Sequence, residues 1–316
     1  MTVTSDDVAR AAGVSRPAVS QILNGRGRFA PETIRRVEEM AAAMNYRPSA
    51  AARTLATGTS DLVVALVPNT TFGTNLQDVI DVLTAELAQV GLTLVLHFSS
   101  SPVELLEHFI TTIRPRAVIA PFVAATNAER KSIEASGVTL IDLAAGQDVN
   151  YRIGQLQGEY LAAKGHQNLV YAHLHDARLD VYGDTREQGL ADYCREHGMA
   201  APNSIRLSVD LLDAISVLRR LPYGVAIACY NDDVAVALLA AAREIERRVP
   251  EDVALVGVDA TRIGALMAPR LTTIAVDTTI AVHVMVHHIV SRLSGSVPAA
   301  PLTDLHLLKV VQGGSA

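Results

Sequence analysis

The side chains with the most suggestive chemistry lie near the start of the chain, between positions 15 and 24. Arg16, Ser20 and Gln21 fall on one side of a short predicted helix, and Val19 and Ile22 fall on the other. Arginine, serine and glutamine carry donors that reach phosphates and base edges when a helix enters the major groove of DNA. The spacing therefore predicts a DNA-reading helix. A small helical hairpin with a merely solvated polar face has the same pattern and is the alternative.

A second group of polar side chains follows the apolar runs in the rest of the chain. In parallel sheets, ligands bind at the carboxyl ends of the strands, so these residues are candidates for a ligand site. They are Asn69, Thr71, Thr74, Asn75, Asp142, His173, His175, Asp176, Asn231, Asp232 and Asp259. Asp and Asn at strand ends also commonly cap helices or form turns, and for Asp232 we give that interpretation equal weight.

An enzyme is the rival class of function, and its signals are weak. His173 and His175 share one face of a predicted strand, and His283 and His287 have the i, i+4 spacing of helical metal sites. Neither pair is accompanied by the third ligand and acidic base that hydrolysis needs. The chain also has no GxxxxGK[ST] phosphate loop, no GxSxG elbow and no GxGxxG after a strand. We expect no catalytic residue, no metal and no cofactor.

Short helices must position the first group of residues. Thr4 followed by Asp7 predicts a capping-box start, and Gly13 can supply the positive φ at the end of that helix. Ser15 caps the second helix, and Pro17 lies in its first turn, where the missing N–H does no harm. The apolar face of the first helix is formed by Val8, Ala11 and Ala12.

A third helix is predicted to begin at Pro31, and an alanine-rich run follows it. The apolar stripe of the third helix consists of Ile34, Val37, Ala41 and Met44. The run SAAARTLATG carries Leu55 and ends at Gly58, ahead of a buried strand. A helix this short is marginal alone in water, so it needs a partner to form.

From Asp61 onward, short apolar strands alternate with amphipathic helices, which predicts parallel sheets covered on both faces. The predicted strands are LVVALV, LTLVLHF, AVIAPF, VTLIDL, LVYAHL, VAIACY, VALVGV and TIAV. The predicted helices lie around 75–90, 103–113, 153–164, 186–197, 232–246 and 278–293. This is more strands than one small doubly wound sheet usually holds, so two lobes are expected.

Composition agrees with a DNA-binding head on a larger body. The first 60 residues carry eight Arg, no Lys and five acidic residues, a net charge of +3, whereas the whole chain carries −6, so the remainder carries −9. Positive charge is needed only where a duplex lies. Two cysteines, Cys194 and Cys229, form no disulfide framework. The start MTVTSDDV lacks an apolar signal region and no run is long enough to span a bilayer, so we expect a cytoplasmic protein without a membrane partner.

At these motifs the chain resembles the lactose/galactose repressor family of bacterial transcription regulators. Members look like DVAxxAGVSxxTVSxxLNG, then PET, then NYxPxxxARxLxTG, and this chain has DVARAAGVSRPAVSQILNG, PET and NYRPSAAARTLATG. The resemblance implies that SAAARTLA is a hinge helix ordered on operator DNA and that Leu55 wedges into a minor-groove base step. The DNA-contacting residues that it implies are Thr4, Ser15, Arg16, Pro17, Ser20, Gln21, Asn24, Arg28, Tyr46, Ala52 and Leu55.

The resemblance also implies an effector site in a type I periplasmic-binding-protein fold, with chain crossovers near Tyr151, Val276 and the strand LLKVV. DTREQG resembles an RxxG stretch in which Arg186 reaches the effector, CYNDDVAVALL resembles ANDxxAxG with Asn231 as a contact, and VALVGVDAT resembles VxVVGFDD with Asp259 as another. Such side chains suit a small polyhydroxylated ligand. The expected effector residues are Asn69, Thr74, Asn75, Asp142, Asn150, His173, Arg186, Asn231 and Asp259.

Several positions depart from the family pattern. FGTN replaces NPFF after the first strand, which predicts a more polar pocket, and Asn150 and Val276 stand where an acid and a frequent Gln are usual. Ala30 replaces a Ser or Thr, so the third helix lacks a side-chain cap. Gln21 replaces a common Arg, which should change the bases that are read.

The fold class expected is therefore α/β with an all-α N-terminal helix-turn-helix module. The expected domains are a headpiece at 1–48, a hinge at 49–59 and a two-lobed effector and dimerisation domain at 60–316, with a first lobe at about 60–151 and 278–304 and a second at about 152–276 and 305–316. The expected function is a transcriptional regulator, a repressor, that binds a palindromic double-stranded operator as a homodimer and responds to a sugar or sugar derivative. A nucleoside or another metabolite is the alternative effector. A dimer is favoured over a tetramer because no apolar heptads follow the lobes.

Overall fold

The protein is described from a computed structural model that covers residues 3–23, 27–46, 60–67, 74–98, 103–121, 124–143, 148–177, 179–296 and 307–316. Three helices form the N-terminal module: α1 (Ser5–Ala12), α2 (Arg16–Leu23) and α3 (Pro31–Ala43). They enclose one small core of Val8, Ala9, Ala12, Val19, Ile22, Val37 and Ala41. On α1 the expected apolar face is partly wrong, because Ala11 is exposed and Ala9 takes its place in the core.

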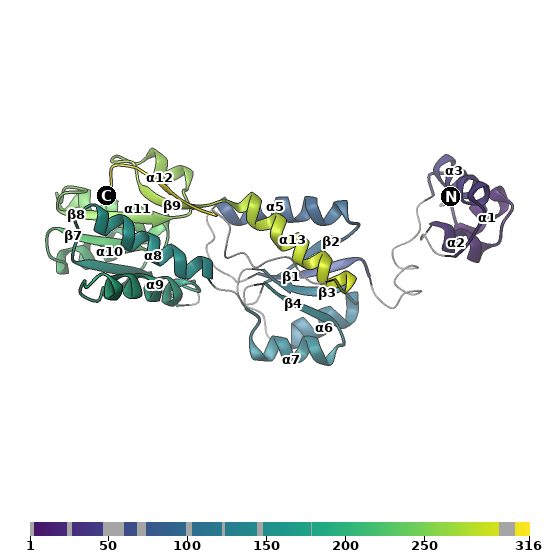
Figure 1. The fold of residues 1–316 in the computed structure, drawn as a ribbon, viewed down its shortest axis with the longest axis horizontal. Helices are drawn as coiled ribbons and strands as arrows, with labels where there is room; N and C mark the ends of the chain where they lie inside the picture. Colours follow the sequence, from purple (N-terminus) through teal and green to yellow (C-terminus); the bar gives the residue numbers. More distant parts are fainter. Residues whose placement is uncertain are drawn as a thin grey trace.

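The first lobe is built on a four-stranded parallel sheet in the order β2-β1-β3-β4. Its strands are β1 (Leu62–Val67), β2 (Thr93–Phe98), β3 (Ala117–Ala120) and β4 (Thr139–Asp142). Along β1, alternate side chains pack against α5 (Thr74–Gln89) and α13 (Thr278–Ser294) on one face. The others pack against α6 (Val103–Ile113) and α7 (Asn127–Ala135). Helix α13 lies beside α5, although some 190 residues separate them in sequence (Figure 1).

The second lobe has a six-stranded sheet in the order β10-β9-β8-β7-β5-β6, parallel except for β10. Its strands are β5 (Leu169–Leu174), β6 (Asn203–Leu207), β7 (Val225–Cys229), β8 (Val253–Val258), β9 (Thr272–Val276) and β10 (Leu308–Val311). Helices α8 (Asp148–Ala163) and α9 (Gly183–Glu196) cover one face. Helices α10 (Leu211–Arg220) and α11 (Asp232–Glu244) cover the other, and α12 (Arg262–Leu266) follows β8.

The two lobes are joined so that the carboxyl ends of both sheets face each other. Strand β4 of the first lobe leads into α8 of the second, and β9 of the second leads directly into α13 of the first (Figure 1). Because β5, β7, β8 and β9 are parallel neighbours, their carboxyl ends share the edge from which the chain returns to the first lobe. Residues just past these strands therefore lie at the edge where a ligand between the lobes would bind.

Four elements were not predicted from the sequence. Strand β6 lies at the edge of its sheet and exposes most of its side chains, so its sequence NSIRL lacks the apolar run of a buried strand. Helices α7, α10 and α12 are short, with 9, 10 and 5 residues, and α7 is polar on most of its surface. Among the described residues, no helix is long and apolar enough to cross a membrane.

Candidate functional site

The start of α1 is fixed by the capping box that its sequence predicts. The amide and hydroxyl of Thr4 donate to Asp7 Oδ2 at 3.0 and 2.7 Å, and the Asp7 amide donates back to Thr4 Oγ1 at 3.4 Å. These hydrogen bonds from the Thr4 side chain and backbone lower the pKa of Asp7. The helix ends at Gly13, whose φ of 67° lies in the left-handed region. Both ends of α1 are thus set locally, which fixes where α2 begins.

Helix α2 presents the predicted polar face to solvent. Arg16, Pro17, Ser20 and Gln21 are exposed, whereas Val19 is completely buried in the core of the module. The Ala18 amide donates to Ser15 Oγ at 3.3 Å, as expected for a helix start. Arg16 Nη1 lies 3.6 Å from Asp6 Oδ2 in an exposed ion pair, which is a weak contact that a phosphate can replace.

The rest of the module holds α2 in place. Helix α3 begins at Pro31 after Ala30, which makes no side-chain cap, as the sequence indicates. Arg36 Nε donates to the carbonyl of Ala12 at 2.9 Å and ties α3 to the end of α1. Arg28 is exposed, and Tyr46 is half-buried against the core. Asn24, Ala52 and Leu55 lie outside the described residues.

In the second lobe, the side chains expected to bind a ligand gather around Arg186, which is 6% exposed. Its Nε donates to Asn150 Oδ1 at 3.0 Å, and its Nη1 donates to the carbonyl of Tyr230. The guanidinium carbon lies 5.3 Å from the centre of the Tyr182 ring and 5.1 Å from that of Tyr230. Two aromatic faces and two acceptors therefore fix the orientation of this cation.

Arg186 and Asn150 meet because α8 and α9 pack unusually closely. A Cβ on Gly154 of α8 would lie 1.8 Å from the Arg186 carbonyl oxygen, and one on Gly189 of α9 would lie 2.0 Å from the Tyr151 carbonyl oxygen. Only glycine fits at such backbone approaches. Gly189 is the glycine of the RxxG stretch DTREQG, but the sequence pattern does not indicate that it or Gly154 lies at a helix contact.

Asn231 and Asp232 share the start of α11 but hold different partners. Asn231 is the N-cap, since its Oδ1 accepts from the Val234 amide at 3.0 Å. Asp232 is almost fully buried and accepts from the Thr261 amide at 2.6 Å and from Thr273 Oγ1 at 2.6 Å. Burial raises the pKa of Asp232 to about 6, against the lowering effect of these hydrogen bonds. Its structural role is thus to pin the loop after β8 and to support β9.

Asp259 lies in that loop, in a backbone conformation that L-residues rarely adopt. Its φ is 103°, and that of Ala260 is 50°. The Asp259 amide donates to the Ile274 carbonyl at 2.9 Å, and the Ala260 amide donates to Thr273 Oγ1 at 3.2 Å. Strained backbone of this kind persists where surrounding bonds over-determine it, and it gathers at functional sites.

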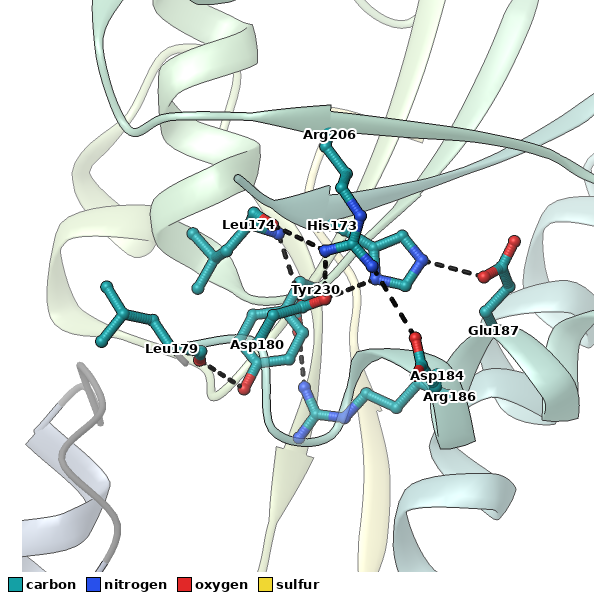
Figure 2. Close-up of polar contacts among 9 residues, drawn as sticks. All are labelled: His173, Leu174, Leu179, Asp180, Asp184, Arg186, Glu187, Arg206 and Tyr230. Atoms are coloured by element: carbon teal, nitrogen blue, oxygen red, sulfur yellow. Dashed lines mark hydrogen bonds and ion pairs between the residues drawn. The ribbon is translucent and has the colours of Figure 1, made fainter. Parts of the chain in front are cut away.

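His173 differs from the expectation that it lines the cleft. It is 1% exposed, and its two ring nitrogens lie 2.6 Å from Asp180 Oδ2 and 2.9 Å from Glu187 Oε2 (Figure 2). His175 lies past the end of β5 and is exposed, so the two imidazoles do not form a pair on one strand face. The position of His173 near the end of β5 does not indicate that the loop after this strand, which carries Asp180, folds over its side chain.

The first-lobe candidates are only partly described. Asp142 closes β4 and accepts from Arg130 Nη2 at 2.7 Å and from the Ala125 amide at 3.2 Å, so it ties α7 to the strand end. Its other oxygen is buried and has no partner among the described residues. Thr74 and Asn75 are the first residues of α5, and their side chains are not described. Asn69 lies outside the described residues.

Several residues of the site have no signal in the sequence patterns used above. Tyr182, Tyr230, Asp180, Glu187 and Arg206 surround Arg186 and His173. Only Tyr230 and Glu187 adjoin a predicted site residue, and this adjacency is the signal that could have found them. Burial raises the pKa of the Tyr182 and Tyr230 hydroxyls, which keeps both neutral.

One group of side chains at the end of β5 has the spacing of a cation site, but an arginine already lies against it. His173, Asp180 and Asp184 offer atoms within 4.8 Å of one another, as a cation site would. However, Arg206 Nη1 lies 3.0 Å from Asp180 Oδ2 and its Nη2 lies 3.8 Å from Asp184 Oδ1, so a guanidinium already supplies the positive charge there. His283 and His287 are exposed on α13, in keeping with a helix surface.

Two family models match the chain. Residues 4–49 match the model of bacterial regulatory proteins of the lacI family, and residues 159–316 match a periplasmic binding protein-like domain. Among curated proteins, the HTH-type transcriptional regulator GntR of Pseudomonas aeruginosa is 30% identical over 86% of this chain and 83% of its own length. Catabolite control protein A of Staphylococcus epidermidis is 25% identical over 87% of each chain.

Solved structures show the same fold. The Lac repressor dimer bound to operator and the anti-inducer ONPF has a TM-score of 0.79 and 21% identity, covering 100% of this chain and 99% of that chain. The transcription regulator GntR from Chromobacterium violaceum has a TM-score of 0.66 and 17% identity, covering 80% of this chain and 98% of that chain. The chain thus combines two lobes built on parallel sheets with a helix-turn-helix module that exposes a face of hydrogen-bond donors. It belongs to the lacI family of bacterial DNA-binding transcriptional regulators.

Proposed function

We propose that this regulator is a repressor that binds a palindromic operator as a homodimer and is switched by a small polar effector held between its lobes. The headpiece is assigned to residues 1–48, the hinge to 49–59 and the effector and dimerisation domain to 60–316. Effector binding closes the lobes and changes the spacing of the two hinges, which alters operator affinity. The Lac repressor structure with operator and anti-inducer supports this scheme as a precedent in a relative.

The observation that carries the effector proposal is the environment of Arg186. A cation of fixed orientation, bonded to the Tyr230 carbonyl just past β7, is suited to bind hydroxyl or carboxylate oxygens. Asp259 lies within electrostatic range of the Tyr182 and Tyr230 hydroxyls beside this cation. The Tyr182 ring, which lies beside the guanidinium and is only partly buried, offers apolar surface for the carbon face of a ring-shaped ligand. We infer a sugar or sugar derivative, and a nucleoside is the second candidate because the same ring would stack on a base.

A thermal-shift screen tests this assignment. The panel contains D-ribose, cellobiose, D-xylulose, polyols, sugar acids and nucleosides, because relatives include a ribose operon repressor and regulators solved with cellobiose and D-xylulofuranose. A compound at about a hundred times its dissociation constant stabilises the folded state by roughly 2.7 kcal/mol. The variant Arg186→Ala should lose this response and the effect of the compound on operator binding. Arg195→Ala, which removes an exposed arginine of the same helix, is the control. A normal response in Arg186→Ala removes this residue from the site.

The DNA-binding assignment has its own test. If Leu55 wedges into the operator centre, as the resemblance implies, Leu55→Ala should weaken specific binding and reduce DNA bending while dimerisation stays intact. Equal operator affinity in the variant would mean that the segment around Leu55 is only a linker.

A further inference from the structure

His173 is a buried histidine that the proposed function does not yet use. It is the fifth residue of β5, and it reaches the loop after that strand through Asp180 and the first turns of α9 through Glu187 (Figure 2). Glu187 follows Arg186 directly, and Asp180 lies two residues before Tyr182. One imidazole ring thus contacts the helix that carries Arg186 and the loop that leads to Tyr182, whose ring lies beside the guanidinium.

The hydrogen-bonding capacity of the ring decides its charge. An ionised carboxylate can only accept a hydrogen bond, and a neutral imidazole has only one N–H to donate. Because each ring nitrogen faces a carboxylate oxygen, both contacts are hydrogen bonds only when the ring is the doubly protonated cation. In the neutral ring, one nitrogen would turn a lone pair toward a carboxylate oxygen at close range.

The charged and titratable groups around the ring come from each neighbouring element. Asp180 belongs to the loop, Glu187 and Asp184 to α9, Arg206 to β6 and Tyr171 to β5, whose ring lies edge-on at 4.6 Å between centroids. Arg206 donates to Asp180 at 3.0 Å and so offsets part of its charge. Asp180 therefore retains a partner when the ring is neutral. Among the described residues, the Glu187 carboxylate has no hydrogen-bond or ion-pair partner other than His173.

The start of α9 is seated directly on this cluster. A Cβ on Gly183, the first residue of α9, would lie 2.4 Å from Asp180 Oδ2 and 2.5 Å from His173 Nδ1. The absence of a side chain lets the helix begin against the ring. Loss of the contact between His173 and Glu187 would therefore be felt at the first turns of α9, where Arg186 lies.

We propose that His173 is a positioning residue whose protonation clamps the N-terminal turns of α9, and with them Arg186, onto β5. Because protonation of His173 depends on pH, effector binding at Arg186 depends on pH as well. This coupling rests on the proposed function. His173, Asp180 and Glu187 together form the His173 clamp.

The direction of the coupling follows from the charge on the ring. Burial lowers the pKa of His173, but the hydrogen bonds to Asp180 and Glu187 outweigh it, and the pKa is raised above its ordinary value of 6.5. The clamp is therefore complete below about pH 6.5 and is lost as pH rises through the higher pKa of the folded protein. Effector affinity should fall over the same interval.

Hydrogen exchange of the full-length protein tests the clamp without any ligand. Protection factors of the amides in 183–190, which divide out the intrinsic pH dependence of exchange, are compared at about pH 6 and about pH 8.5. In the wild type they should fall by roughly tenfold, the effect of losing one charge-assisted hydrogen bond. His175→Gln, two residues away and exposed, should show the same fall as the wild type.

The decisive variant is Glu187→Gln. A glutamine amide can donate to a neutral ring nitrogen or accept from a protonated one, so the contact no longer requires the cation. Protection of α9 should become independent of pH in this variant, whereas His173→Gln should show low protection at both values. Wild-type protection that does not change with pH, or a pH dependence that survives in Glu187→Gln, overturns the proposal.

The panel of compounds described above, screened at the same two pH values, separates the two proposals. A responding compound should give a smaller thermal shift at the higher pH in the wild type and an equal shift at both in Glu187→Gln. If no compound responds at either pH, the effector proposal fails, and the exchange data still decide whether the His173 clamp exists.

Discussion

The close packing of α8 on α9 allows a graded test at two glycines of one helix. A Cβ on Gly154 would lie 1.8 Å from the Arg186 carbonyl oxygen, where ordinary contact begins at 3.4 Å. The obstacle is backbone, so Gly154→Ala must force the two helices apart. A Cβ on Gly158 would meet the Tyr193 and Leu190 side chains at 2.8 and 2.9 Å, and these side chains can rotate away.

The magnitudes follow from two opposing effects. Overpacking costs about 1 to 3 kcal/mol and sometimes more, and replacing glycine by alanine inside a helix returns roughly 1 kcal/mol. We expect Gly154→Ala to lower the free energy of unfolding by about 2 kcal/mol, the upper end of the overpacking cost less the amount that alanine returns, because backbone cannot rotate away. Gly158→Ala should stay within about 1 kcal/mol of the wild type.

Urea unfolding followed by far-ultraviolet circular dichroism measures both values, since the chain has no tryptophan for fluorescence. Glu159→Ala, on the exposed side of α8, is the control for mutating this helix. Gly154→Ala should also weaken the effector response, because the displaced carbonyl belongs to Arg186 itself. Equal losses of stability in Gly154→Ala and Gly158→Ala would refute the argument that backbone contact sets the cost.

Three further predictions concern other parts of the chain. Gln21→Ala should lose discrimination at one base pair per half-site, an adenine by the chemistry of the side chain, at a cost of roughly 1 to 3 kcal/mol, and an unchanged consensus in binding-site selection would contradict it. Ala30→Ser should stabilise the start of α3 by about 0.5 to 1 kcal/mol, visible as slower amide exchange in its first turn, because the extended residue before Pro31 makes no side-chain cap. Because the pKa of Asp232 is raised to about 6, its stabilising contribution is present below its ordinary pKa of 3.8 and is lost as pH rises through about 6. Stability measured from about pH 4 to about pH 7 should therefore fall less in Asp232→Asn than in the wild type, and parallel curves would show that Asp232 does not titrate there.

The sequence patterns predicted the parts of the molecule that depend on local periodicity. The polar face of α2, the capping box at Thr4 and the buried strands β1, β5, β7 and β8 follow from residue spacing alone. Edge strand β6 was missed because exposure removes its apolar signal.

The candidate site shows a different limit. Arg186 was found through its motif, but the two tyrosine rings beside it come from separate segments, and no spacing rule joins them. His173 was expected to line the cleft, and it is buried beneath the loop that follows β5, because a residue near the end of a strand can face either a cleft or a loop folded over it. The tertiary course of the loop decides between the two.

The return of α13 to the first lobe has a consequence for how the chain is made. Val282, Val286 and Ile289 of α13 complete the core that begins with Val63 and Val67 of β1. During synthesis, that face of the first sheet is covered only in part, by α5, until nearly all of the second lobe has left the ribosome. The second lobe in turn gains its edge strand β10 only after α13. Neither lobe is a contiguous folding unit, and the late, long-range closure of both predicts slow maturation and a nascent chain that exposes apolar surface to chaperones.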